Sequence, residues 1–214
     1  MTLPPHSGQT LVTLGRPLGE GRAVMVMIHG RHAGPKNILD LATPLVHPDF
    51  TYLAPSAAGG AWYPNSFMAE RASNEPGLSS GLAVIAGLIE EIAARGVPKR
   101  RIILLGFSQG ACLASEFMVR HSGRYGGLIG YSGGLIGPPG TTWSESGRFD
   151  GMPVFLGCSD IDGHVPKSRV DESAEVFGRM GAVVTERIYP GMGHLINEDE
   201  VGWARRVMAQ VAEN

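Results

Sequence analysis

Residues 101–117 read RIILLGFSQGACLASEF, and this stretch decides the fold. An apolar, partly β-branched run is followed by the pattern Gly-x-Ser-x-Gly and then by a run of helix-forming residues. This order predicts a strand, a sharp turn and a helix, which is the context of a nucleophile elbow. A Cβ atom at Gly106 or Gly110 would clash with the neighbouring strand or helix, so the turn needs glycine at both positions. The sequence therefore predicts that Ser108 is a nucleophile held above a sheet.

A serine hydroxyl needs a base, and the base needs a group that orients it. In chains with this elbow the order is serine, then aspartate or glutamate, then histidine. His121, His164 and His194 follow Ser108. His121 lies near the end of the helix after the elbow, where a histidine commonly interacts with the helix dipole. His194 lies on a glycine-rich loop after the strand-like segment 182–188, within reach of the elbow, and we predict that it is the base.

The acid should lie between the serine and the histidine. Residues 152–158 have the pattern of a short buried strand, and a helix is expected to begin near Pro166. The loop between them holds Asp160 and Asp162. Either carboxylate could orient the histidine, cap the next helix or form an Asx-turn, and the spacing alone does not choose between them.

Four segments resemble the phospholipase/carboxylesterase family of α/β-hydrolases, in particular its small bacterial carboxylesterases and its acyl-protein thioesterases. They are Ile28-His29-Gly30-Arg31, Trp62-Tyr63-Pro64, the Gly106–Gly110 elbow, and Asp162-Gly163-His164-Val165-Pro166 with Gly191-Met192-Gly193-His194. The resemblance covers roughly residues 24–200. It implies that Asp162, three residues before the Val-Pro pair, is the acid, and that Asp160 supports the loop. The chain departs from the family pattern at Gly163, where proline is usual, and at His164.

An oxyanion hole requires preorganised N–H donors. One donor is expected to be the backbone N–H of Gln109, directly after the nucleophile and at the start of a helix. The other should come from the loop after the strand 23–28, and the resemblance implies the backbone N–H of Arg31. We expect His29 to be a buried residue that pins this loop.

From residue 23 onward the pattern alternates between strand and helix. The expected strands are 23–28, 50–54, 101–106, 126–131, 152–158 and 183–189, with an antiparallel edge strand at 11–14. The expected helices are 36–46, 78–95, 109–121, 167–180 and 198–212. This alternation predicts an α/β fold, a mostly parallel sheet with helices on both faces and the site at the carboxyl ends of the strands. The resemblance implies an α/β-hydrolase fold without a large cap domain.

The substrate pocket is expected to involve the long loop after the strand 50–54. Tyr63 and Phe67 could line this pocket or form a hydrophobic cluster under the loop. The resemblance favours substrate contact for Trp62, and we include Met192, beside the predicted base, in the expected substrate-binding set.

Length and composition indicate one domain over residues 1–214, which the resemblance implies is an α/β-hydrolase domain, and we expect residues 1–10 to be poorly ordered. An apolar content of 43% with 18% charged residues excludes a disordered chain, and a net charge of −2 gives no sign of nucleic-acid binding. Cys112 and Cys158 look like buried hydrophobes, and no metal or cofactor is expected. Without a leader pattern or a long apolar run, we expect a cytoplasmic protein with no stable membrane insertion. The sequence leaves a homodimer open.

These features predict a serine-dependent carboxylic ester hydrolase that acts through an acyl-enzyme on small-molecule esters with short to medium acyl chains. An acyl-protein or acyl-CoA thioesterase would use the same residues. A lysophospholipase is a weaker alternative, since no basic amphipathic surface helix is evident. An alternative of a different class is a hydrolase-like binding protein without turnover.

Overall fold

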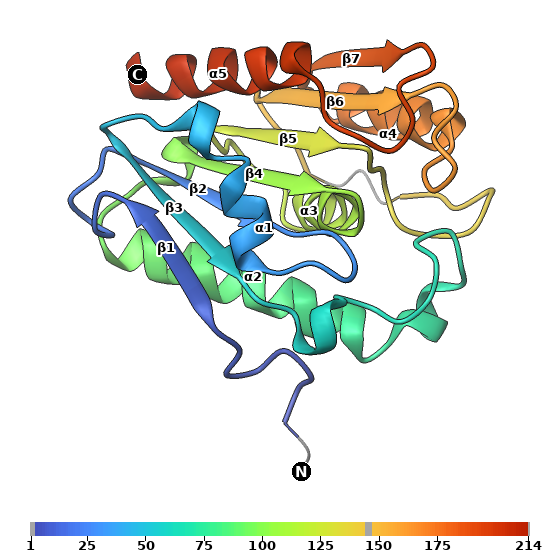
Figure 1. Cartoon of the computed structure of the whole chain (residues 1–214), viewed down its shortest axis with the longest axis horizontal. Helices are drawn as coiled ribbons and strands as arrows, with labels where there is room; N and C mark the ends of the chain where they lie inside the picture. Colours follow the sequence, from blue (N-terminus) through green and yellow to red (C-terminus); the bar gives the residue numbers. More distant parts are fainter. Residues whose placement is uncertain (1–2, 144–146, 214) are drawn as a thin grey trace.

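A seven-stranded sheet organises the computed structural model, which describes residues 3–143 and 147–213 (Figure 1). The strands lie in the order β1-β3-β2-β4-β5-β6-β7, and only β1 is antiparallel to its neighbour. Their bounds are β1 Leu11–Gly15, β2 Ala23–Ile28, β3 Phe50–Pro55, β4 Ile102–Phe107, β5 Gly127–Tyr131, β6 Pro153–Ser159 and β7 Val183–Tyr189. The predicted α/β-hydrolase fold is confirmed, including the antiparallel edge strand.

Helices cover both faces of the sheet, because side chains along the buried strands alternate between the two faces. On β2, Val24 and Val26 face α2, α3 and α4, whereas Met25 and Met27 face α1 and α5. The bounds are α1 Pro35–Asp40, α2 Gly77–Ala94, α3 Gln109–Arg120, α4 Lys167–Arg179 and α5 Glu198–Glu213, with short 3₁₀ turns at Thr43–Leu45, Ala58–Gly60, Arg71–Asn74 and Lys99–Arg101. No large cap domain covers the sheet in the described part of the chain.

One detail of the sequence prediction was wrong. The helix expected over 36–46 ends at Asp40 and gives way to a 3₁₀ turn. Pro44 explains the break, because it has no N–H to donate to the carbonyl of Asp40. Near the N-terminus, His6 is 3% exposed and hydrogen-bonds through its ring to the carbonyl of Trp62 and the N–H of Ala58.

The helix α2 is long and apolar enough to cross a membrane by length and composition, with a mean hydropathy of 1.5 over 18 residues. Half of this window is buried inside the protein. Leu78, Ile85 and Ile92 are fully buried and pack in the core cluster under the sheet. In this fold α2 is therefore packed as a core helix.

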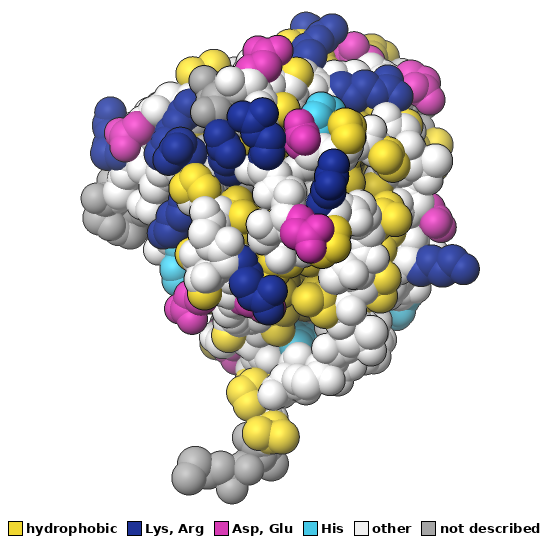
Figure 2. Space-filling view, turned by 90° about the vertical axis from the view of Figure 1, so that its left-hand side faces the viewer, with side chains coloured by type: hydrophobic (Ala, Val, Ile, Leu, Met, Phe, Trp, Pro, Cys, Tyr) yellow, Lys and Arg dark blue, Asp and Glu magenta, His cyan; other side chains and the backbone are white. Residues whose placement is uncertain are grey.

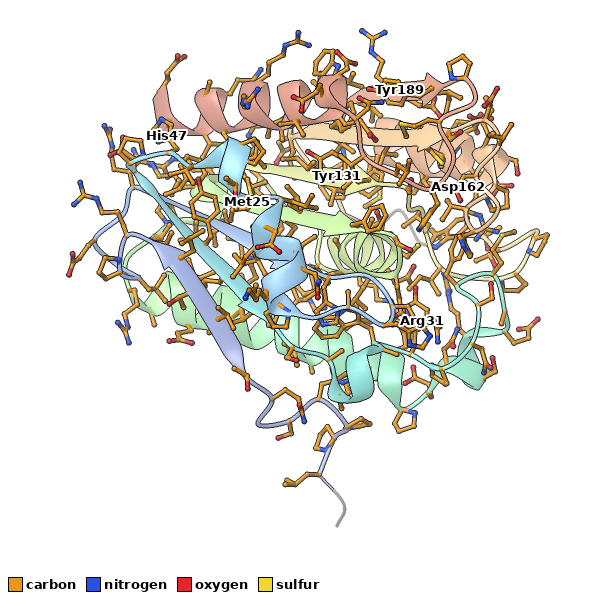
Figure 3. The ribbon with its side chains drawn as sticks, viewed as in Figure 1. Met25, Arg31, His47, Tyr131, Asp162 and Tyr189 are labelled. Atoms are coloured by element: carbon orange, nitrogen blue, oxygen red, sulfur yellow. The ribbon has the colours of Figure 1, made fainter. Side chains whose placement is uncertain are left out.

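The carboxyl ends of β4, β5, β6 and β7 point to one side of the molecule, where the loops with Arg31 and Asp162 also lie (Figures 1 and 3). Figure 2 shows the opposite side, at the amino ends of these strands, where Lys and Arg side chains gather on the upper part of the surface. The predicted site residues thus share one edge of the sheet, as expected for parallel strands, away from the side shown in Figure 2.

Candidate active site

Ser108 lies at the turn between β4 and α3 with φ 55° and ψ −121°, a backbone conformation that a non-glycine residue rarely adopts. A Cβ atom on Gly106 would lie 2.5 Å from backbone atoms of Gly110, at the start of α3. A Cβ on Gly110 would lie 2.0 Å from the carbonyl oxygen of Ile28 in β2. The close approach of helix and strands thus requires both glycines, as the sequence predicted, and holds the Ser108 backbone in its strained turn.

A chain of two hydrogen bonds joins the three predicted triad residues. Nε2 of His194 lies 2.9 Å from Oγ of Ser108, and Nδ1 of His194 lies 2.7 Å from Oδ2 of Asp162. The three residues follow β4, β6 and β7, so residues up to 86 positions apart in the sequence meet above the sheet. A base can therefore reach the hydroxyl while a carboxylate holds its other nitrogen.

The second oxygen of Asp162 is also satisfied. Oδ1 accepts hydrogen bonds from the N–H groups of His164 and Val165, at 2.8 and 3.0 Å. Burial by itself raises the pKa of Asp162, but the hydrogen bonds from His194 and from these two N–H groups outweigh it, and the net pKa is lowered. Asp162 is accordingly a carboxylate at neutral pH, with one oxygen for the loop and the other for the histidine.

Asp160 has a different position. Its Oδ1 accepts the N–H of Gly191 at 2.8 Å, so that it joins the loop after β6 to the loop that carries His194. Ser159 does the same from a fully buried position, since its Oγ accepts the N–H of Gly193 at 3.0 Å. Sequence reasoning missed Ser159. A signal was present in the sequence, because Ser159 lies at the end of a buried strand and the glycine-rich loop before His194 has N–H groups that need hydrogen-bond acceptors.

The two N–H groups expected in the oxyanion hole, those of Arg31 and Gln109, donate no hydrogen bond to any described part of the chain. Gly30 brings the first of these loops close to the serine, since a Cβ on Gly30 would lie 3.3 Å from Cβ of Ser108. The N–H of Gln109 lies at the N-terminus of α3, where the helix dipole favours negative charge. Both donors are thus available beside the hydroxyl.

His29 lies behind the site and takes no part in the hydrogen bonds to Ser108. It is 1% exposed, its Nδ1–H donates to the carbonyl of Gly30 at 2.8 Å, and its Nε2 accepts the N–H of Ala57 at 3.1 Å. Burial lowers the pKa of His29, which keeps the ring neutral in this role. These contacts agree with the predicted role of His29 as a buried residue that holds the loop after β2.

A cavity of about 530 Å³ opens beside Ser108 and His194. Tyr63 and Phe67 line it, together with Arg31 and Gln109. Tyr63 and Phe67 are also buried members of the core cluster, so they occupy both of the positions that the sequence left open, the cavity wall and a hydrophobic cluster. His164 also lines it, with its ring edge-on to that of His194 at 4.8 Å between centroids.

Trp62 and Met192 were expected at the substrate but do not line this cavity. Trp62 is fully buried, and its indole N–H donates to the carbonyl of His29 at 2.9 Å, which turns the ring into the core. The sulfur of Met192 accepts a hydrogen bond from the amide of Asn197, toward the start of α5. In both cases a polar partner behind the loop directs the side chain away from the cavity.

Both cysteines are free and buried, as predicted. Cys112 lies at the wall of the cavity, and burial raises the pKa of its thiol to about 12. Burial likewise raises the pKa of Cys158 to about 12. Neither residue therefore carries a reactive thiolate at neutral pH.

A buried carboxyl group supports the end of the loop that carries His194. Glu200 accepts the N–H of Asn197 through Oε2 at 2.9 Å, and Asn197 Oδ1 accepts the N–H of Glu200 at 3.0 Å. This reciprocal pair is a capping box at the start of α5. The other oxygen, Oε1, is buried and has no hydrogen-bond partner in the described part of the chain, so the charged form of Glu200 is disfavoured in the fold.

Glu200 should therefore make stability depend on pH. Burial raises its pKa to about 7 in the folded protein, while its pKa in the unfolded chain is near the ordinary value of 4.5. Between these values the folded state binds more protons than the unfolded state, so stability falls as pH rises toward 7, by about 3 kcal/mol in all. Glu200→Gln removes this titration, and its melting temperature relative to wild type should rise by about 5–10 °C between pH 5 and pH 8.

Thermal unfolding at the two pH values checks this expectation. Glu198→Gln is the matched control, because Glu198 is an exposed residue of the same first turn of α5. Its melting temperature relative to wild type should be the same at both pH values. A constant difference between Glu200→Gln and wild type across this range would contradict the assignment of the titration to Glu200.

Comparison with known proteins identifies the family of the chain. Residues 16–211 match the family described as Phospholipase/Carboxylesterase. The chain is 31% identical to acyl-protein thioesterase 1 of Eremothecium gossypii over 66% of its own length and 61% of that protein. It is 30% identical to acyl-protein thioesterase 1 of Gibberella zeae over 53% of its own length and 49% of that protein. The chain thus spans about half to three fifths of the length of these two relatives.

Among solved structures, the phospholipase/carboxylesterase from Dyadobacter fermentans superposes with a TM-score of 0.90 at 37% identity, over 94% of this chain and 97% of that one. The structure titled esterase PE8 superposes with a TM-score of 0.77 at 22% identity, which supports the fold. The matched residues 16–211 contain all the residues predicted for the triad and the oxyanion hole. The chain belongs to the phospholipase/carboxylesterase family.

Proposed function

We propose that this protein is a serine-dependent carboxylic ester hydrolase that works through an acyl-enzyme. The observation that carries the proposal is the pair of hydrogen bonds from His194 to Ser108 and to Asp162, at 2.9 and 2.7 Å. This arrangement activates a hydroxyl and stabilises the imidazolium that forms when the hydroxyl loses its proton.

In the acylation step, Oγ of Ser108 attacks the ester carbonyl and passes its proton to Nε2 of His194. The carbonyl oxygen gains negative charge and accepts hydrogen bonds from the N–H groups of Arg31 and Gln109. His194 then gives its proton to the alcohol oxygen as the ester bond breaks. The alcohol leaves, and the acyl group stays on Ser108.

In the deacylation step, a water molecule replaces the alcohol. His194 removes a proton from this water, the resulting nucleophile attacks the acyl carbon, and the same two N–H groups hold the oxyanion. The proton returns through His194 to Oγ of Ser108, and the carboxylic acid is released. Asp162 remains ionised throughout and keeps the imidazole in the tautomer with a proton on Nδ1.

The cavity supports substrates of modest size. Its volume of about 530 Å³ is in the range of ordinary small-molecule sites. Tyr63, Phe67 and Val165 give it apolar walls near the serine. We therefore propose that the substrates are small-molecule esters with short to medium acyl chains. We also propose that the protein acts in the cytoplasm as one domain, with its own side chains and water as the reacting groups.

Thioester hydrolysis is the second candidate, because two relatives matched over part of their length are named acyl-protein thioesterase 1. The same residues would serve both reactions, since an oxyanion forms at the same carbonyl. The difference lies in the leaving group, a thiol in place of an alcohol.

A panel of matched substrates tests both candidates. p-Nitrophenyl esters with acetyl, butyryl, octanoyl and palmitoyl groups are compared with N-acetylcysteamine thioesters of the same acids. We expect kcat/KM to be at least about ten-fold lower for palmitoyl than for butyryl esters, because the cavity cannot enclose the long chain. Higher kcat/KM for every thioester than for its ester would favour a thioesterase. Absence of turnover in the whole panel, with Ser108 unlabelled by a fluorophosphonate, would favour a binding protein.

A further inference from the structure

Two side chains hold the segment 62–65, of which residues 63–65 form one wall of the cavity. The guanidinium of Arg31 donates from Nη2 to the carbonyls of Tyr63 and Asn65, at 2.9 and 2.6 Å, and from Nη1 to the carbonyl of Pro64, at 2.8 Å. The side chain of Gln109 accepts the N–H of Trp62 at 2.8 Å and donates to the carbonyl of Tyr63 at 2.9 Å. The carbonyl of Tyr63 thus accepts one hydrogen bond from each.

Arg31 and Gln109 are the two residues whose backbone N–H groups are proposed to bind the oxyanion. In each residue the side chain hydrogen-bonds to the cavity wall, and the backbone N–H is the proposed donor to the reacting oxygen. The partners of the Arg31 side chain are three successive carbonyls that its planar fork can reach together. A lysine, with a compact charge, would not bind three carbonyls in this fixed geometry.

The loop that contains Arg31 needs such support. The next residue, His32, has φ 59°, a left-handed conformation that is costly for a residue with a Cβ. Its N–H donates to the carbonyl of Gly60 at 2.8 Å, and the N–H of Ala33 donates to Gly30 at 3.3 Å. Without the side chain of Arg31, this strained loop would lose three hydrogen bonds to the cavity wall.

We propose that the side chains of Arg31 and Gln109, joined through the carbonyl of Tyr63, are positioning groups that fix the two oxyanion-hole N–H groups relative to each other and to the cavity wall. This inference rests on the proposed ester hydrolysis. An oxyanion hole stabilises the transition state because its donors are preorganised, and misplacement of a donor by about 1 Å can cost up to about 100-fold in rate.

The central test is Arg31→Met, which keeps the length of the side chain and removes every donor. We expect kcat for p-nitrophenyl butyrate to fall about 10-fold to 100-fold with little change in KM, because the loss falls on the transition state. Arg31→Lys should lie between Arg31→Met and wild type. A second readout is inhibition by a trifluoromethyl ketone, whose carbonyl carbon bonds to Oγ of Ser108 and whose oxygen becomes an oxyanion. Its affinity should weaken by about the same factor as kcat.

Gln109→Met and the double variant test the connection through Tyr63. If both side chains act through one carbonyl, the loss in the double variant should be clearly smaller than the product of the two single losses.

Arg71→Met is the matched control, because Arg71 binds the carbonyl of Ile136 and pairs with Glu116 but does not line the cavity. It should keep wild-type kcat and inhibitor affinity. If Arg31→Met does not fold, Arg31→Lys and Gln109→Met provide the same measurements.

Three results would overturn the inference: kcat of Arg31→Met within two-fold of wild type, a loss of kcat without weaker ketone binding, or fully multiplicative losses in the double variant. A loss confined to substrates with a carboxylate would instead make Arg31 a ligand for charge, which monoethyl succinate against ethyl butyrate reveals. These outcomes differ from failure of the proposed function, in which the wild type itself turns over no ester and Ser108 is not labelled.

Discussion

Ser108→Ala should reduce ester turnover by about five to six orders of magnitude, close to the loss from removing all three triad residues. The residues act as a unit, because His194 has no proton to take once the hydroxyl is gone. The fold should be unaffected, since alanine also carries a Cβ and the strained turn at φ 55° is set by the packing of Gly106 and Gly110. The melting temperature should therefore stay close to that of wild type.

The measurements are single-turnover release of p-nitrophenol, mass spectrometry of the fluorophosphonate adduct and thermal unfolding. Ser115→Ala is the matched control, because Ser115 lies on α3, two turns beyond the elbow, and is fully buried. It should keep the burst and the adduct, whereas Ser108→Ala should lose both. Wild-type turnover in pure Ser108→Ala protein would rule out Ser108 as the nucleophile.

The parts of the fold and site that the sequence could predict are those with local causes. The alternation of strands and helices follows from hydrophobic periodicity and length, so all seven strands were predicted within one or two residues. The elbow at Ser108 could be predicted because close contacts require its two glycines. Gly106 packs against Gly110 at the start of α3, and Gly110 packs against Ile28 in β2. Parallel strands then place the loops after β4, β6 and β7 on the same edge.

The parts that could not be predicted depend on contacts between distant segments. The direction of the Trp62 ring is set by the carbonyl of His29, 33 residues away, and no local pattern encodes that bond. The ring of His6 hydrogen-bonds to the carbonyl of Trp62, 56 residues away, and no local pattern predicts this contact. The bonds from Arg31 to residues 63–65 were invisible for the same reason, since the resemblance concerned only its backbone N–H.

Asp162→Asn should reduce turnover by about four orders of magnitude while the protein stays folded. The geometry gives the reason. The side-chain oxygen of asparagine can replace Oδ1 of Asp162 and keep the bonds from His164 and Val165. The amide nitrogen then replaces Oδ2 and faces His194 as a donor. The imidazole must present an unprotonated Nδ1 to it, which puts the proton on Nε2, so the ring can no longer accept the proton of Ser108.

Asp160→Asn separates this orienting role from a supporting one in the same loop. Asparagine can still accept the N–H of Gly191 through its oxygen, so the loop that carries His194 should keep its position. We expect turnover within about ten-fold of wild type. Both variants are measured on one ester, with circular dichroism to confirm folding. A severe loss in Asp160→Asn beside near-normal turnover in Asp162→Asn would transfer the orienting role to Asp160. Comparable, mild losses in both variants would mean that neither carboxylate fixes the tautomer of His194.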